Sequence, residues 1–124
     1  MKPREMIDVL ENPEAPALTG HDEGGEELLV MLAHMYHADG EIDAGELAQL
    51  SRVSGVTDGI QQRLAELKEK PLNIPKLAEL FPEAKDRDDI VTLAEHAVFG
   101  DGKVDHSEWD IVEKLVEGLG VKRD

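Results

Sequence analysis

The sequence predicts an all-α fold of six to seven helices in two pseudo-repeated halves, and three observations carry this prediction. Apolar residues recur at helical spacing, and no segment alternates β-branched or aromatic residues as a strand would. Aromatic residues make up only 3% of the chain, so Leu, Val, Ile and Ala must fill the core, which favours a helical bundle. A helix–acidic turn–helix unit also occurs twice.

The two units match at one constant offset. The stretch HMYHADGEIDAGE (34–46) returns as HAVFGDGKVDHSE (96–108), 62 residues later. The following apolar positions keep this offset, because Leu47, Leu50 and Val53 correspond to Trp109, Val112 and Leu115. The spacing predicts an internal duplication over about 28–56 and 90–121. Each half is too small to bury its apolar stripe unless it packs against the other.

The remaining elements follow from breakers and caps. Residues 1–25 are predicted to form a short helix opened by Pro3 and then a loose linker rich in proline and glycine, and residues 26–124 a helical domain. Within that domain, helices are expected over about Glu26–His37, from Asp43 to Gly55, from Thr57 or Asp58 to Pro71, from Asn73 to Pro82, up to Gly100 and again from Asp105.

Charge and composition exclude several classes of function. The chain holds 13 Lys and Arg against 28 Asp and Glu, a net charge of −15, which repels phosphate backbones and anionic lipids. Nucleic acid is therefore not expected as a partner, whereas basic protein surfaces and metal ions are. The absence of cysteine excludes disulfides and thiolate chemistry. No apolar run suggests a signal peptide or membrane span, so we expect a cytoplasmic protein, which is compatible with membrane-linked complexes.

The acidic turns resemble part of a calcium loop. The pattern D-G-x-I/V-D-x-x-E fits positions 5, 6, 8, 9 and 12 of an EF-hand. Position 1 is Met35 or Ala97 and position 3 is His37 or Phe99, so the early carboxylate ligands are missing. A true EF-hand is therefore not expected, and any calcium affinity would be on the order of millimolar.

Two interpretations of the turns stay open. Asp43 and Asp105 are suited to be N-caps, with Glu46 and Glu108 as their capping-box partners, and this explains most of the motif without a ligand. Asp39 and Asp101 fit less well, because a carboxylate at a helix C-terminus faces the negative end of the helix dipole. The alternative is capping combined with weak divalent cation binding, with candidate metal ligands Asp39, Asp43, Glu46, Asp101, Asp105 and Glu108.

His34 and His96 correspond across the repeat, one turn before each acidic stop. A histidine and carboxylate site for zinc can be drawn from them, but five residues separate His34 from Asp39, which turns the two side chains apart on a helix. Histidines that favour the C-terminal helix dipole are the alternative.

The segments MLAHMYHADGEIDAGELAQL and LAEHAVFGDGKVDHSEWDIVEKLVEGLGV resemble the tellurite-resistance TerB family, over about residues 26–121. Its helical unit is also similar to the central domain of a DnaJ-like membrane co-chaperone. The resemblance implies an all-α fold with two pseudo-symmetric halves, an acidic metal site at the six carboxylates above, and an interaction module in cytoplasmic chemical-stress complexes. Gly100 and Lys103 depart from the family pattern in the second turn.

No phosphate loop, G-x-S-x-G or H-E-x-x-H motif is present. The sequence therefore favours a non-enzymatic interaction or regulatory module whose acidic surface docks a basic partner. The alternative is a metal-dependent hydrolase or metal sensor that uses the two D-x-x-x-D-x-x-E turns.

Overall fold

A computed structural model describes residues 2–12, 14, 16, 22–37, 44–55, 58–99 and 106–121. Within these residues the chain forms seven α-helices and no strand, which confirms the predicted all-α class. The helices are α1 (Pro3–Glu11), α2 (Glu23–His37), α3 (Ala44–Ser54), α4 (Ile60–Glu69), α5 (Ile74–Leu80), α6 (Ala84–Phe99) and α7 (His106–Leu119). None of these described helices is long and apolar enough to cross a membrane.

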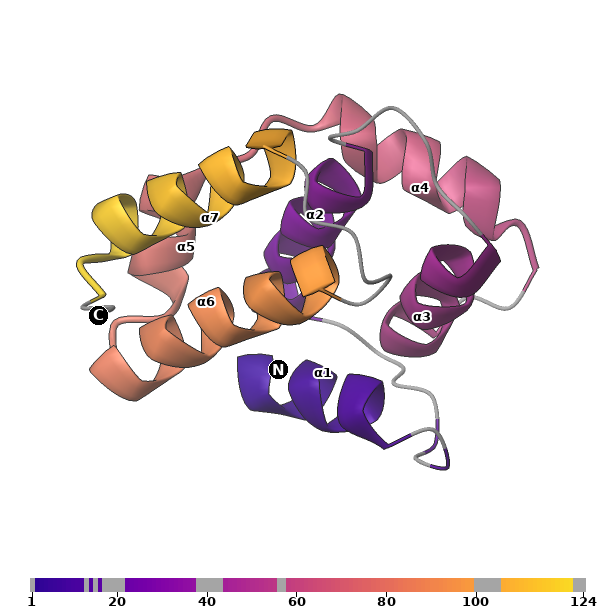
Figure 1. The fold of residues 1–124 in the computed structure, drawn as a ribbon, viewed down its shortest axis with the longest axis horizontal. Coiled ribbons are helices and arrows are strands. Elements are labelled where there is room, and N and C mark those ends of the chain that lie inside the picture. Colours follow the sequence, from indigo (N-terminus) through magenta and orange to yellow (C-terminus); the bar gives the residue numbers. More distant parts are fainter. Residues whose placement is uncertain are drawn as a thin grey trace.

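Helix α2 is the centre of the molecule (Figure 1). Its six consecutive residues from Leu28 to Ala33 are all 0% exposed, so this part of the helix has no solvent-facing side. A helix that is apolar around its whole circumference has to be covered on every side. The covering comes from α3, α4, α5, α6 and α7, each of which packs against α2.

The two predicted hairpins are α2–α3 and α6–α7, and they pack together through α2 and α6. Leu50 and Val53 of α3 are buried, and so are the residues at the equivalent positions of α7, Val112 and Leu115. Both hairpins therefore bury the same stripe, as the 62-residue offset predicts.

The helix that precedes each hairpin packs against both hairpins. Helix α1 packs against α6 and α3, and α5 packs against α2 and α7 (Figure 1). Met6 and Ile7 of α1 are fully buried in the same core as α2 and α6. Helix α1 thus shares the core of the domain predicted for residues 26–124, and α1 and α5 each join the two hairpins.

Helix α2 begins three residues before the predicted start at Glu26, and the prediction of a loop at Gly24 and Gly25 was wrong. The Asp22 carboxylate accepts a hydrogen bond from the Gly25 backbone N–H at 2.8 Å and so caps the helix. A Cβ at Gly24 would lie 2.9 Å from Cζ of Phe81. The glycine therefore marks a close contact between α2 and the end of α5.

Two other predicted boundaries agree with the structure, and the start of α4 differs. Helix α3 ends at Ser54 and is followed by Gly55 in the left-handed conformation, with φ of 75°. The Asn73 side chain caps α5 by accepting from the Lys76 backbone N–H at 3.0 Å. Helix α4 begins at Ile60, after the predicted Thr57 or Asp58, because Gly59 before it is left-handed.

Candidate functional site

The six predicted metal ligands lie at the two acidic turns. Four of them, Asp39, Asp43, Asp101 and Asp105, lie outside the described residues, and the side chains of Glu46 and Glu108 do so as well. The helices on either side end and begin as the motif predicts, at His37 and Ala44 and at Phe99 and His106. Capping and metal binding at the turns therefore both stay predictions. Elsewhere in the described part of the chain, no three His, Asp or Glu side chains form a group that could hold a metal ion.

The two equivalent histidines each contact the C-terminal end of another helix. His34 on α2 lies with Nε2 2.6 Å from the carbonyl oxygen of Lys70, just after α4, so this nitrogen donates the hydrogen bond. His96 on α6 lies with Nε2 3.0 Å from Oε1 of Glu11, the last residue of α1. Each histidine thus fixes the helix that enters an acidic turn to a neighbouring helix. Both side chains have a structural partner without any metal.

Carboxylates near the start of α2 hold α4 and α5 in place. Glu26 accepts hydrogen bonds from Arg63 at 2.5 Å and from Lys70 at 2.9 Å. Lys76 of α5 lies 3.2 Å from both Glu23 and Glu27. Acidic residues in the first turns of a helix also complement its dipole. These three carboxylates are therefore engaged in holding the fold together.

Partial burial of the Glu26 carboxylate raises its pKa, but the hydrogen bonds and charges of Lys70 and Arg63 outweigh burial. The net pKa of Glu26 lies below the ordinary value of a glutamate. The ionised form is thus more favourable in the folded chain than in the unfolded one, and it contributes to stability.

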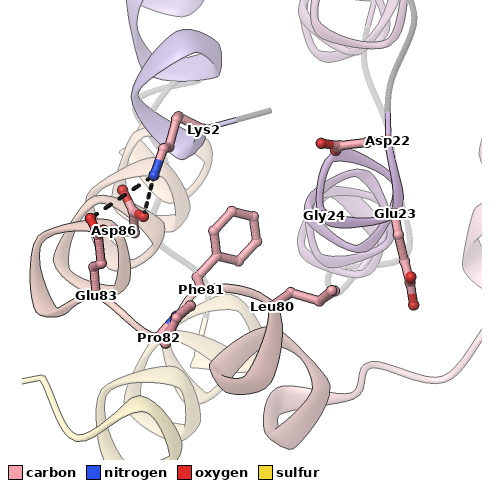
Figure 2. Close-up of a pocket in the computed structure, with 9 residues that line it drawn as sticks. All are labelled: Lys2, Asp22, Glu23, Gly24, Leu80, Phe81, Pro82, Glu83 and Asp86. Carbon is pink, nitrogen blue, oxygen red and sulfur yellow. Dashed lines mark hydrogen bonds and ion pairs between the residues drawn. The ribbon is translucent and has the colours of Figure 1, made fainter.

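A cavity of about 350 Å³ lies where α1, α2 and α6 begin and α5 ends (Figure 2). The Phe81 ring stands in its centre, with Asp22 and Glu23 on one side and Glu83 and Asp86 on the other. The remaining lining residues are Lys2, Gly24, Leu80 and Pro82.

The carboxylates of this cavity already have partners in the chain. The Lys2 ammonium lies 2.9 Å from Asp86 and 4.0 Å from Glu83, and the hydrogen bond to Asp86 is the main cause of the raised pKa of Lys2. Asp22 caps α2 and Glu23 pairs with Lys76, as described above. The cavity is therefore a junction of helix ends, and its carboxylates pair with lysines or cap a helix.

A second cavity, of about 330 Å³, lies between the start of α6 and the end of α7. Arg87 at its edge donates to the carbonyl oxygens of Phe81 at 2.9 Å and Ala78 at 2.8 Å. These are carbonyls at the end of α5, which a helix leaves without partners inside itself. Arg87 therefore acts as a cap for α5, and its role is structural.

Helix α7 carries an exposed acidic stripe that the sequence motifs did not single out. We define the acidic stripe as Asp110, Glu113 and Glu117, which are exposed and have no ion-pair partner among the described residues. Their spacing of three and four residues places them on one face of the helix, opposite Val112 and Leu115. The buried positions Val112 and Leu115, which the sequence predicts, are the signal that could have located the acidic residues on the opposite face of the helix. Exposed Lys114 lies beside the stripe, so the face keeps a net negative charge.

Comparisons of the chain with protein-family models, curated proteins and solved structures find no match. Any assignment of function therefore rests on the repeated sequence motif and on the geometry described above.

We predict that Glu26→Gln lowers the free energy of unfolding by about 1–2 kcal/mol at pH 7, because two charge-assisted hydrogen bonds are weakened. The folded pKa is depressed, so the contribution is present above the unfolded pKa of about 4.3 and is lost as the pH falls through the folded pKa. The difference in the free energy of unfolding between parent and variant, measured by urea denaturation, should therefore shrink below about pH 4.3. Glu66→Gln is the matched control, because Glu66 contacts the same Arg63 at 3.7 Å but is mostly exposed. An equal loss in both variants, or a difference that is independent of pH, would contradict this prediction.

Proposed function

We propose that this chain is a non-enzymatic interaction module whose acidic surface docks a basic partner protein. By its resemblance to the TerB family, the module belongs to a cytoplasmic chemical-stress system of the tellurite-resistance type. The acidic turns add weak binding of a divalent cation. The metal-dependent hydrolase or sensor remains the alternative.

The observation that carries the proposal is the contrast between two sets of described carboxylates. Those at the starts of α2 and α6 are engaged with Arg63, Lys70, Lys76 and Lys2. The acidic stripe on α7 has no such partner among the described residues and faces solvent. Carboxylates that pair with lysine or arginine within the fold attract a basic partner less strongly, because the neighbouring cation offsets their charge. The carboxylates of the stripe have no such offset and can attract a basic partner.

The position of the stripe supports the same proposal. Asp110 follows the second turn closely in sequence, so the turn carboxylates Asp101 and Asp105 and the stripe belong to one acidic stretch of chain. Complementary charge mainly increases the rate and specificity of association, which suits a module that recruits partners. A cation bound at a turn would change the charge of this stretch directly.

We predict that removing the charges of the stripe weakens docking. The triple variant Asp110→Asn, Glu113→Gln, Glu117→Gln should recover the bound partner about tenfold less in native pull-downs from tellurite-stressed cells, because each exposed charge contributes up to about 1 kcal/mol. The control removes three exposed carboxylates elsewhere, by Asp58→Asn, Glu69→Gln and Glu79→Gln. Equal recovery by the two triple variants would remove the stripe as the docking face, and no specific partner with the parent chain would count against the proposal as a whole.

We predict that the turns bind divalent cations with affinities on the order of millimolar, because each turn offers only three carboxylates. Calorimetric titration of chelator-treated protein with calcium, magnesium, manganese and zinc should give saturable heat in the parent chain. Asp39→Asn and Asp101→Asn should each reduce that heat. Absence of heat, or unchanged heat in both variants, would leave the motif as helix caps only.

A further inference from the structure

We propose that α1 couples the two hairpins, so that a displacement of one is transmitted to the other through the C-terminal end of α1. The proposal concerns the fold of the chain and does not depend on which partner or cation the protein takes. It rests on contacts that one side chain from each hairpin makes with Glu11, the last residue of α1, and with Asn12, which follows it.

The two contacts meet at Glu11 and Asn12. Arg52 in the last turn of α3 donates from Nη2 to the carbonyl oxygen of Asn12 at 2.6 Å. His96 in the last turn of α6 lies with Nε2 3.0 Å from Oε1 of Glu11. The end of α1 is therefore held from both hairpins at once, and we call this pair of contacts the α1 clamp.

The packing of α1 supports this role. Met6 and Ile7 are fully buried, and α1 packs against α6 of the second hairpin and α3 of the first (Figure 1). The Lys2–Asp86 ion pair fixes the other end of the helix to α6. A closely packed helix that is held at both ends moves as one body, so a shift at one contact has to be accommodated at the other.

The other half of the repeat provides a contrast. His34 makes the equivalent contact with the end of α4 at Lys70, but α4 packs against α2 and α3, which both belong to the first hairpin. The His34–Lys70 hydrogen bond thus joins helices of one half. The His96–Glu11 contact, by contrast, lies beside the Arg52–Asn12 hydrogen bond, which comes from the other half. The two helices that contact the end of α1 each lie next to an acidic turn in the chain, since α3 follows the first turn and α6 precedes the second. A ligand that shifts one hairpin would therefore bias the other, and this coupling has to be reciprocal.

The test is amide hydrogen exchange in full-length Glu11→Gln. Glu11 contacts His96, and no hydrogen bond or ion pair among the described residues joins it to Arg52. An effect on α3 can therefore pass through α1 or through α2, which packs against both α3 and α6. A path through α2 would also speed exchange at 28–33 of α2, whereas transmission through α1 should leave exchange there as in the parent. We predict exchange about 1.5- to 5-fold faster both at 94–97 of α6 and at 50–53 of α3, which corresponds to the loss of one exposed pair. Arg52→Gln should show the reciprocal effect at 94–97.

The matched control is Arg4→Gln, because Arg4 pairs with Asp8 within α1 at 3.2 Å and makes no described polar contact with either hairpin. This variant should leave exchange at 50–53 and 94–97 as in the parent. Faster exchange only at 94–97 in Glu11→Gln would overturn the coupling. The same change in both regions in Arg4→Gln would show that general loosening of α1, and not the clamp, is responsible.

Discussion

The structure depends on the complete burial of α2. Because the residues from Leu28 to Ala33 expose no surface, five other helices have to surround this segment, and neither hairpin can do so alone. Helix α5 contributes to this covering, since it packs against α2 of the first hairpin as well as against α7 of the second. Helix α1 packs against α6 and α3 and so joins the two hairpins at another place. Burial of apolar side chains contributes about 1.5–3 kcal/mol for each large residue. Helix α2 supplies more of the described buried apolar residues than any other helix, so its contribution to stability is the largest.

Two sets of carboxylates differ in their surroundings. Glu23, Glu26 and Glu27 bind the few available cations and position α4 and α5 on the central helix. The acidic stripe on α7 takes no part in such pairs among the described residues. Near α2, lysine and arginine partners neutralise part of the negative charge that a binding partner would meet. On α7 the acidic stripe has no such partners among the described residues, so more of its negative charge is available.

The sequence predicted the parts of the fold that depend on local periodicity and capping. The apolar stripes of α3 and α7, the Asn73 cap and the stop at Gly55 are all local signals, and all are present. The start of α2 could not be read in this way, because Gly24 and Gly25 resemble a linker until Phe81 of α5 is seen to pack against Gly24. Nor could the contacts of His34 and His96 be predicted, since their partners Lys70 and Glu11 are distant in sequence. For the candidate site, the sequence indicated the six turn carboxylates but not the acidic stripe, whose meaning depends on which other carboxylates are already paired.

The most direct measurement of this interdependence uses two fragments, residues 1–72 with α1 to α4 and residues 73–124 with α5 to α7. If neither half can bury its own apolar residues, each fragment alone should show little helix by circular dichroism and no cooperative thermal transition. An equimolar mixture should regain helix content and a cooperative transition, because α1 then covers α6 and α5 covers α2. Cooperative unfolding of either fragment alone, near the melting temperature of the intact chain, would contradict the central role of packing between the two parts of the chain.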